Sequence, residues 1–179
     1  MDEISITREW VEQFVIGLNL CPFAKKPALE GRIRYVLFEG KDPKALGELL
    51  AKELLFLQAT DPAVVETTLL IHPCALRDFA DYNDYLEVWD ELLVGLDLEG
   101  DIQVASFHPD YQFEGTHPND PENYTNRSPF PMLHLIREAS VERAVDLYPD
   151  IDAIPERNIA RLNELGIVGI LKHFNFNRF

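Results

Sequence analysis

Residues 104–138 hold the densest collection of chemically useful side chains in the sequence. An apolar run ends at Phe107, and the loop that follows has almost no helical or strand periodicity. Irregular loops of this length are uncommon in compact domains and are usually functional or disordered. This one is rich in aromatic residues, which disordered linkers seldom contain. We therefore expect a folded loop that builds a site, with His108, Asp110 and Tyr111 as candidate catalytic residues.

Histidines and carboxylates in this region could bind a divalent transition metal. If residues 131–147 form a helix, His134 and Glu138 are four positions apart and share one face. His108 and Asp110 could add ligands from the loop, and such donors suit Zn²⁺, Fe²⁺ or Mn²⁺. The predicted metal ligands are His108, His134 and Glu138. In the alternative interpretation, these side chains cap, pack and pair within the protein.

The segment 123–128, NYTNRS, is suited to binding an anion. A guanidinium can make bidentate contacts with a carboxylate or phosphate, and the free amides of a following helix also favour anions. The predicted binding residues are Asn123, Tyr124, Asn126, Arg127, Ser128 and Arg137. Alternatively, the Asn and Ser side chains satisfy loop backbone groups, and Arg127 pairs internally with Asp120 or Glu122.

Cys21 is a candidate nucleophile. If Pro22 opens a helical turn, the thiol lies at its N-terminus, where backbone amides, together with Lys25 and Lys26, would lower its pKa. The tetrapeptide Cys-Pro-Phe-Ala resembles the active-site turn of thiol transferases of the glutathione-transferase class. In those proteins a strand precedes the cysteine, whereas here a helix does. The alternative is a buried, inert cysteine.

Short apolar runs alternate with amphipathic helices, and these elements must position the candidate residues. Strands are predicted near 33–38, 67–71 and 102–107, and helices near 10–18, 43–57, 79–93, 131–147 and 155–165. The alternation predicts a single α/β domain over residues 1–179, with a small, mostly parallel sheet of three to four strands flanked by helices. The long irregular loop follows the third strand, and a fourth strand could lie within 166–174. Ligands collect at the carboxyl ends of strands in such sheets, where His108 and Asp110 lie.

The composition is strongly acidic, with 31 acidic and 16 basic residues and a formal net charge of −15. Such a field repels phosphate backbones and anionic membrane surfaces, so we expect neither nucleic acid nor membrane partners. The N-terminus lacks a signal-peptide pattern, and no apolar run has the length of a membrane span. Two cysteines do not make a disulfide scaffold. We therefore expect a cytoplasmic protein.

The sequence also resembles a bacterial and plastid family that is known only as a domain of unknown function, number fourteen-fifteen in that series. The blocks that carry the resemblance are WVEQFVIGLNLCPFA (10–24), ETTLLIHP (66–73), DYNDYL (81–86), QVASFHPDYQFEGT (103–116), NYTNRSPFPMLHLIREASVERAV (123–145) and PERNIARLNELG (155–166). Membership implies one domain and a shared site, and it brings no established activity.

The residues favour an enzyme that acts on a small anionic metabolite through a His/Asp/Arg pocket, with or without a metal. In this hypothesis His108 acts as a base or ligand, Tyr111 donates a hydrogen bond, and Arg127 and Arg137 hold the anion. Two alternatives stay open. One is a non-catalytic protein that binds a ligand or a partner, and the other is a thiol-dependent transferase that uses Cys21.

Overall fold

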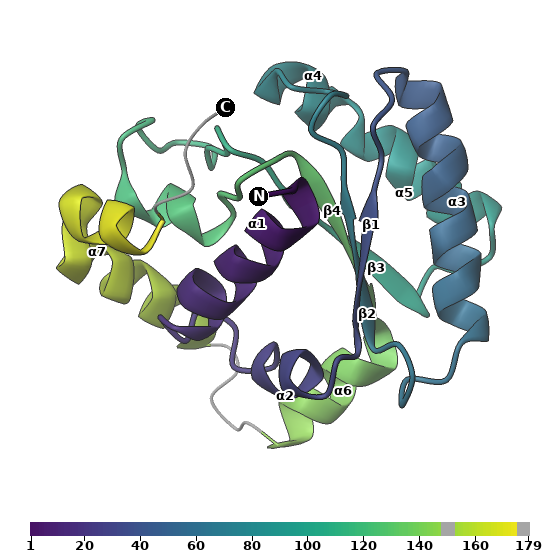
Figure 1. Cartoon of the computed structure of the whole chain (residues 1–179), viewed down its shortest axis with the longest axis horizontal. Helices are drawn as coiled ribbons and strands as arrows, with labels where there is room; N and C mark the ends of the chain where they lie inside the picture. Colours follow the sequence, from purple (N-terminus) through teal and green to yellow (C-terminus); the bar gives the residue numbers. More distant parts are fainter. Residues whose placement is uncertain (148–152, 175–179) are drawn as a thin grey trace.

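A four-stranded sheet lies at the centre of the computed structural model, which describes residues 1–147 and 153–174 (Figure 1). The strand order is β1-β2-β4-β3. The strands are β1 (Ile33–Leu37), β2 (Thr67–Ile71), β3 (Ile102–Phe107) and β4 (Met132–Arg137). β1 and β2 are parallel, whereas β4 runs antiparallel to both of its neighbours. The predicted α/β class and strand number are confirmed, but the sheet is mixed rather than mostly parallel.

Helices cover both faces of the sheet (Figure 1). The face here called the α3/α5 face carries α3 (Pro43–Ala59), α4 (Phe79–Asp84) and α5 (Leu86–Gly95). The opposite face, the α1/α7 face, carries α1 (Glu3–Trp10), a π-helical turn η1 (Val11–Ile16), α2 (Lys25–Leu29), a 3₁₀ helix η2 (Pro121–Thr125) and α7 (Ile154–His173). α6 (Glu138–Leu147) follows β4 directly. No helix within the described ranges is both long and apolar enough to span a bilayer.

α3 shows how the sequence specifies these helices. Asp42 caps its N-terminus by accepting a hydrogen bond from the Lys44 amide, and Pro43 occupies the first turn. A stripe of leucines at helical spacing is fully buried against the sheet: Leu46, Leu50, Leu54 and Leu57. Each such side chain stabilises the fold by about 1.5–3 kcal/mol through burial. The α3/α5 core therefore follows from the sequence pattern.

The prediction of one helix from residue 131 to 147 is wrong in its first half. Residues 132–137 form β4, and the helix begins only at Glu138. Both faces of β4 are covered: Leu133 packs into the α3/α5 core and Met132 into the opposite core. A strand buried on both faces reads as a nearly continuous apolar run, which has no strand period. His134 and Glu138 therefore do not share a helical face.

The C-terminal part is helical, and the fourth strand expected within 166–174 is not there. α7 continues to His173 and buries Ile170 in the α1/α7 core. Gly166 interrupts the helix with φ 61° and ψ 171°, so a kink follows the predicted end of the helix near 165, and the helix then continues. The sheet instead takes its additional strand from residues 132–137.

Candidate functional site

A cavity of about 1470 Å³ lies on the α1/α7 face of the sheet. Pockets for small molecules usually measure roughly 300–1,000 Å³, so this one has room for a ligand of that class. Much of its wall is apolar and comes from α1, η1, the sheet and the segment before α2, including Trp10, Val15, Leu20, Ile33, Leu69 and Phe107. The cavity can therefore hold an apolar body.

Most charged groups on the wall of this cavity neutralise one another. Arg32 pairs with Glu30 at 2.6 Å and also with Glu66, and Arg143 lies 3.6 Å from Glu66. Lys26 and Glu122 add one charge of each sign. The large cavity thus offers no strong preference for ligand charge.

His134 and Thr67 form a polar pair on the sheet where it faces the cavity. His134 Nε2 lies 2.7 Å from Thr67 Oγ1, and Thr67 Oγ1 donates to the Leu135 carbonyl. Burial lowers the pKa of His134 to about 4, so its ring is neutral near pH 7. The His134 side chain is half-buried, and the part that solvent can reach faces the open cavity.

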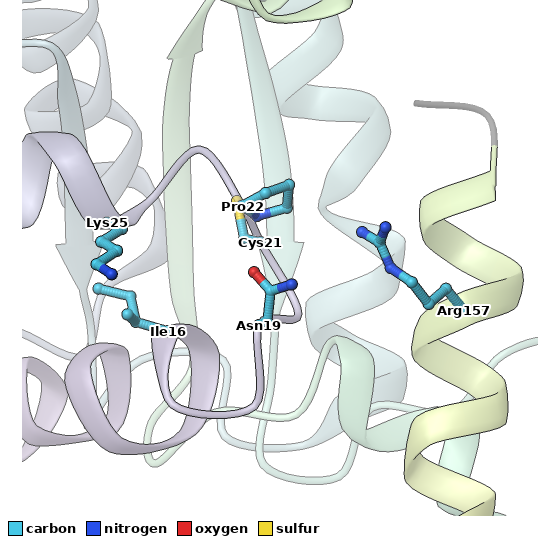
Figure 2. Close-up of a pocket in the computed structure, with 6 residues that line it drawn as sticks. All are labelled: Ile16, Asn19, Cys21, Pro22, Lys25 and Arg157. Atoms are coloured by element: carbon cyan, nitrogen blue, oxygen red, sulfur yellow. The ribbon is translucent and has the colours of Figure 1, made fainter. Parts of the chain in front are cut away.

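A second, smaller hollow of about 410 Å³ adjoins the first and is polar (Figure 2). Figure 2 shows Arg157 reaching from α7 toward the segment of Cys21 and Pro22, with Asn19 below and Lys25 on the other side. None of the described residues that line this pocket is a carboxylate, and neither Lys25 nor Arg157 forms an ion pair with another described residue. Cys21 and Pro22 line both hollows, so the two meet there.

Local backbone geometry brings Cys21 to this junction. The π-helical turn ends at Ile16, and Asn19 takes the left-handed conformation with φ 55°. The Asn158 side chain donates to the Leu20 carbonyl at 2.7 Å and holds this turn against α7. A turn follows Cys21, as the Cys-Pro pair predicts, and its carbonyl accepts from the Ala24 amide.

The pKa of Cys21 is shifted in the direction opposite to the one expected for a thiol at the N-terminus of a helical turn. Burial raises the pKa of its thiol, and the amides of Phe23 and Ala24 lower that pKa without reversing the effect. Cys21 is half-buried, whereas Cys74 is exposed. The predicted amides are present, but desolvation outweighs them.

The predicted catalytic residues His108, Asp110 and Tyr111 line neither hollow. His108 is fully buried, with its ring centroid 5.3 Å from Phe79 and 5.1 Å from Tyr82. Its Nδ1 accepts from the Asp110 amide, and burial lowers its pKa even though the charge of Asp110 raises it. The ring is sealed in the α3/α5 side of the protein, so it does not contact a ligand in either hollow.

The residues predicted to bind an anion mostly organise the loop itself. Arg127 is buried and donates to the carbonyls of Tyr111 (3.1 Å) and Pro118 (2.7 Å), while its guanidinium covers the Tyr124 ring at 4.7 Å. Its hydrogen-bond partners are therefore backbone carbonyls, and the internal pairing expected with Asp120 or Glu122 is not what the structure contains.

The amide and hydroxyl side chains of the same segment also bind within the loop. Asn123 accepts from Phe113 and Thr116 and donates to His117. Ser128 donates to the Phe130 carbonyl. Asn126 donates to Ser106 and alone among the predicted anion-binding residues lines the large cavity.

Arg137 lies at the end of β4 that is farther along the chain from the loop of Arg127. Its guanidinium donates to the carbonyls of Thr60 (2.7 Å) and Val65 (3.0 Å), in the connection between α3 and β2. Burial lowers its pKa. Arg137 braces this connection and does not join Arg127 in an anion site.

The predicted metal ligands are not brought together. His134 pairs across the sheet with Leu69, whose side chain is in the α1/α7 core, whereas the His108 ring packs on Tyr82 in the opposite core. Glu138 begins α6, one residue beyond the strand. Within the described ranges, no three His, Cys, Asp or Glu side chains lie close enough to hold a metal.

Sequence reasoning named His134 as a metal ligand but missed its pairing with Thr67, and it did not single out Arg157 or Asn158. Thr67 and His134 meet only through the pairing of β2 with β4, which no local pattern reveals. Arg157 and Asn158 lie near the start of the helix predicted at 155–165. The predicted features that do lie in this region are the Cys-Pro turn with its two lysines, His134 and Asn126.

The comparisons with known proteins identify a family and no activity. The family model described as "Protein of unknown function (DUF1415)" matches residues 2–172. No curated protein and no solved structure matches the chain.

Proposed function

We propose that this chain, which belongs to the DUF1415 family, binds a small anionic amphiphile. The apolar body of the ligand occupies the large cavity, and its negatively charged head occupies the pocket beside Cys21. The observation that carries the proposal is that Cys21 and Pro22 line both hollows, one largely apolar and the other cationic.

The head-group pocket is unusual for so acidic a protein. The chain has a formal net charge of −15, yet Lys25 and Arg157 line this pocket with no carboxylate among its described lining residues. Exposed cations attract an anion modestly, and a guanidinium also makes bidentate contacts with a carboxylate. An anion bound here would be drawn by a local field that opposes the field of the whole molecule.

The apolar cavity supplies the remaining affinity. Burial of one methylene group contributes about 0.8 kcal/mol, which is roughly a fourfold gain in affinity for each added carbon. A carboxylate with a longer alkyl chain should therefore bind more tightly until the cavity is filled. Because His108 and Arg127 are buried and hydrogen-bonded within the protein, and Asp110 lines neither hollow, the geometry favours binding over the enzyme built on those residues.

The test is the affinity of alkyl carboxylates from hexanoate to dodecanoate, measured by calorimetry. We expect the dissociation constant to fall with chain length, and Arg157→Gln to weaken dodecanoate binding about 2- to 5-fold. Arg161→Gln is the matched control, since it removes the same charge from α7 at a residue that lines neither hollow. No binding at any chain length, or equal loss in both variants, would contradict the proposal.

A second candidate function is thiol chemistry at Cys21, as in a thiol-dependent transferase. The location of the thiol at the junction of the hollows and the stabilising amides of Phe23 and Ala24 favour it. The raised pKa counts against it, because the thiolate is the reactive form. Rapid, ligand-dependent alkylation of Cys21 near neutral pH would support this candidate.

A further inference from the structure

The proton on the His134 ring can be assigned from its neighbours. Thr67 has a single hydroxyl hydrogen and gives it to the Leu135 carbonyl, which can only accept. The hydroxyl therefore cannot also donate to His134 Nε2, 2.7 Å away. Nε2 must carry the hydrogen and donate to Thr67 Oγ1. In the neutral ring, this leaves Nδ1 as an acceptor with a free lone pair.

The position of His134 directs this acceptor to the cavity. His134 lies on β4, between Leu69 of β2 and Ala105 of β3, in the middle of the sheet. Among the described residues, Nε2 of His72 and Nε2 of His108 are fully buried and have no hydrogen-bond partner. Nδ1 of His134 does not belong to this set of buried, unpartnered atoms. No described residue donates a hydrogen bond to Nδ1, so this atom reaches the open space that His134 lines.

Apolar side chains lie beside this acceptor on the wall of the cavity. The Phe107 ring lies 6.2 Å from the His134 ring, and Leu69 and Ile136 also line the cavity. Thr67 already donates its hydroxyl hydrogen to the Leu135 carbonyl. A purely hydrocarbon ligand would cover Nδ1 and leave it unsatisfied, which carries a free-energy cost.

We infer that His134 determines specificity and that the ligand is a hydroxylated carboxylate whose hydroxyl group donates to His134 Nδ1. This inference rests on the proposed function and narrows its ligand class. Thr67 is a positioning residue, because it acts only through the tautomer of His134. The hydroxyl-bearing ligand should bind about 3- to 10-fold more tightly than its unsubstituted parent, the usual range for one hydrogen bond in an apolar site.

The experiment compares dodecanoate with the positional isomers of monohydroxydodecanoate. The binding of each is measured to the native protein and to His134→Phe. The native protein should prefer at least one isomer by about 3- to 10-fold. His134→Phe keeps an aromatic ring and removes the acceptor, so the variant should no longer distinguish the hydroxylated ligand from dodecanoate. Should this variant fail to fold, His134→Leu makes the same test.

A second measurement needs no variant. ¹⁵N NMR of the native protein distinguishes a pyridine-type from a pyrrole-type nitrogen, and we expect Nδ1 of His134 to be the pyridine type near pH 7. A protonated Nδ1 would overturn the inference whatever the binding data. If dodecanoate binds but no isomer is preferred, the inference fails and the proposed function stands. If no carboxylate binds, the proposed function itself fails, and the ligand class inferred here fails with it.

Discussion

At Cys21, burial and backbone amides act on the thiol in opposite directions, and burial is the stronger effect. We therefore predict that iodoacetamide labels the exposed Cys74 faster than Cys21 at pH 7, the reverse of the order that the sequence suggests. Labelling of Cys21 should become prominent only above the ordinary thiol pKa, because its own pKa is raised. Peptide mass spectrometry over a pH series measures both rates.

Dodecanoate provides the control for this labelling experiment. A head group beside Cys21 should protect that thiol and leave Cys74 unaffected. Faster labelling of Cys21 than of Cys74 at pH 7 would show that the amides outweigh burial and would favour the transferase candidate.

Arg127 acts on stability rather than on ligand binding, because its guanidinium satisfies two loop carbonyls. Arg127→Ala leaves the carbonyls of Tyr111 and Pro118 without these donors, at a cost of about 1–3 kcal/mol for each hydrogen bond lost from the charged guanidinium. For a chain of this size, we expect the melting temperature to fall by roughly 5–15 °C. Differential scanning calorimetry measures the change.

The control for Arg127 is Arg161→Ala, which removes an exposed arginine and should change stability by no more than about 0.5 kcal/mol. Dodecanoate binding to the folded fraction of Arg127→Ala should be unchanged. An unchanged melting temperature with lost binding would restore Arg127 as an anion-binding residue.

At the scale of elements, the kink in α7 depends on Gly166. Its φ of 61° and ψ of 171° form a backbone conformation that is almost restricted to glycine. Gly166→Ala should destabilise the protein by about 1–3 kcal/mol, although no atom lies within 4 Å of the added Cβ. Urea unfolding monitored by circular dichroism measures the loss.

Gly47, inside α3, is the matched control for Gly166. A Cβ added there also meets nothing within 4 Å, but its backbone is helical. Gly47→Ala should stabilise the protein by roughly 0.5–1 kcal/mol, because alanine loses less entropy on forming a helix. If both substitutions change the free energy of unfolding equally, the backbone conformation at Gly166 does not require glycine.

The elements that were predicted correctly are those whose apolar residues repeat clearly at either the helical or the strand spacing. Leu46, Leu50, Leu54 and Leu57 repeat at helical spacing, and α3 follows. MLHLIR of β4 is apolar at four of its six positions because both of its faces are covered, so neither period stands out. The proline before it suits the start of a helix equally well. Tertiary burial decided between the two structures, and local sequence could not.

The site was less predictable than the fold, for a related reason. Residue type indicated which side chains could do chemistry, but not where they point. Arg127 has the guanidinium of an anion site and uses it on backbone carbonyls. His134 becomes an acceptor only because the register of β2 and β4 places Thr67 beside it.

For the whole molecule, buried histidines make stability depend on pH. Burial lowers the pKa of His72 and of His134 to about 4 and also lowers that of His108. Between about pH 6.5, the unfolded value, and about pH 4, the unfolded chain binds more protons than the folded one. The stability that these neutral rings contribute is therefore present above about pH 6.5 and is lost as the pH falls.

We predict that the free energy of unfolding decreases from pH 7 to pH 4.5, with each of His72 and His134 contributing up to about 3 kcal/mol. Urea titrations at several pH values measure the slope. His134→Phe should make it shallower, whereas His173→Gln, at an exposed position near the end of α7, should not. If the pH dependence of the free energy of unfolding is the same in His134→Phe as in the native protein, the pKa of His134 is not lowered by folding.

The place of β4 in the sheet also constrains how the chain can be made. β3 has no neighbour in the sheet other than β4, and β2 has only β1 until β4 arrives. A ribosome delivers residues 67–107 well before residues 132–137, so both strands wait with open edges while the long loop is synthesised. Unpaired edges invite association with other chains. The interval between translation of Phe107 and of Arg137 is therefore the period in which the nascent protein most needs a chaperone.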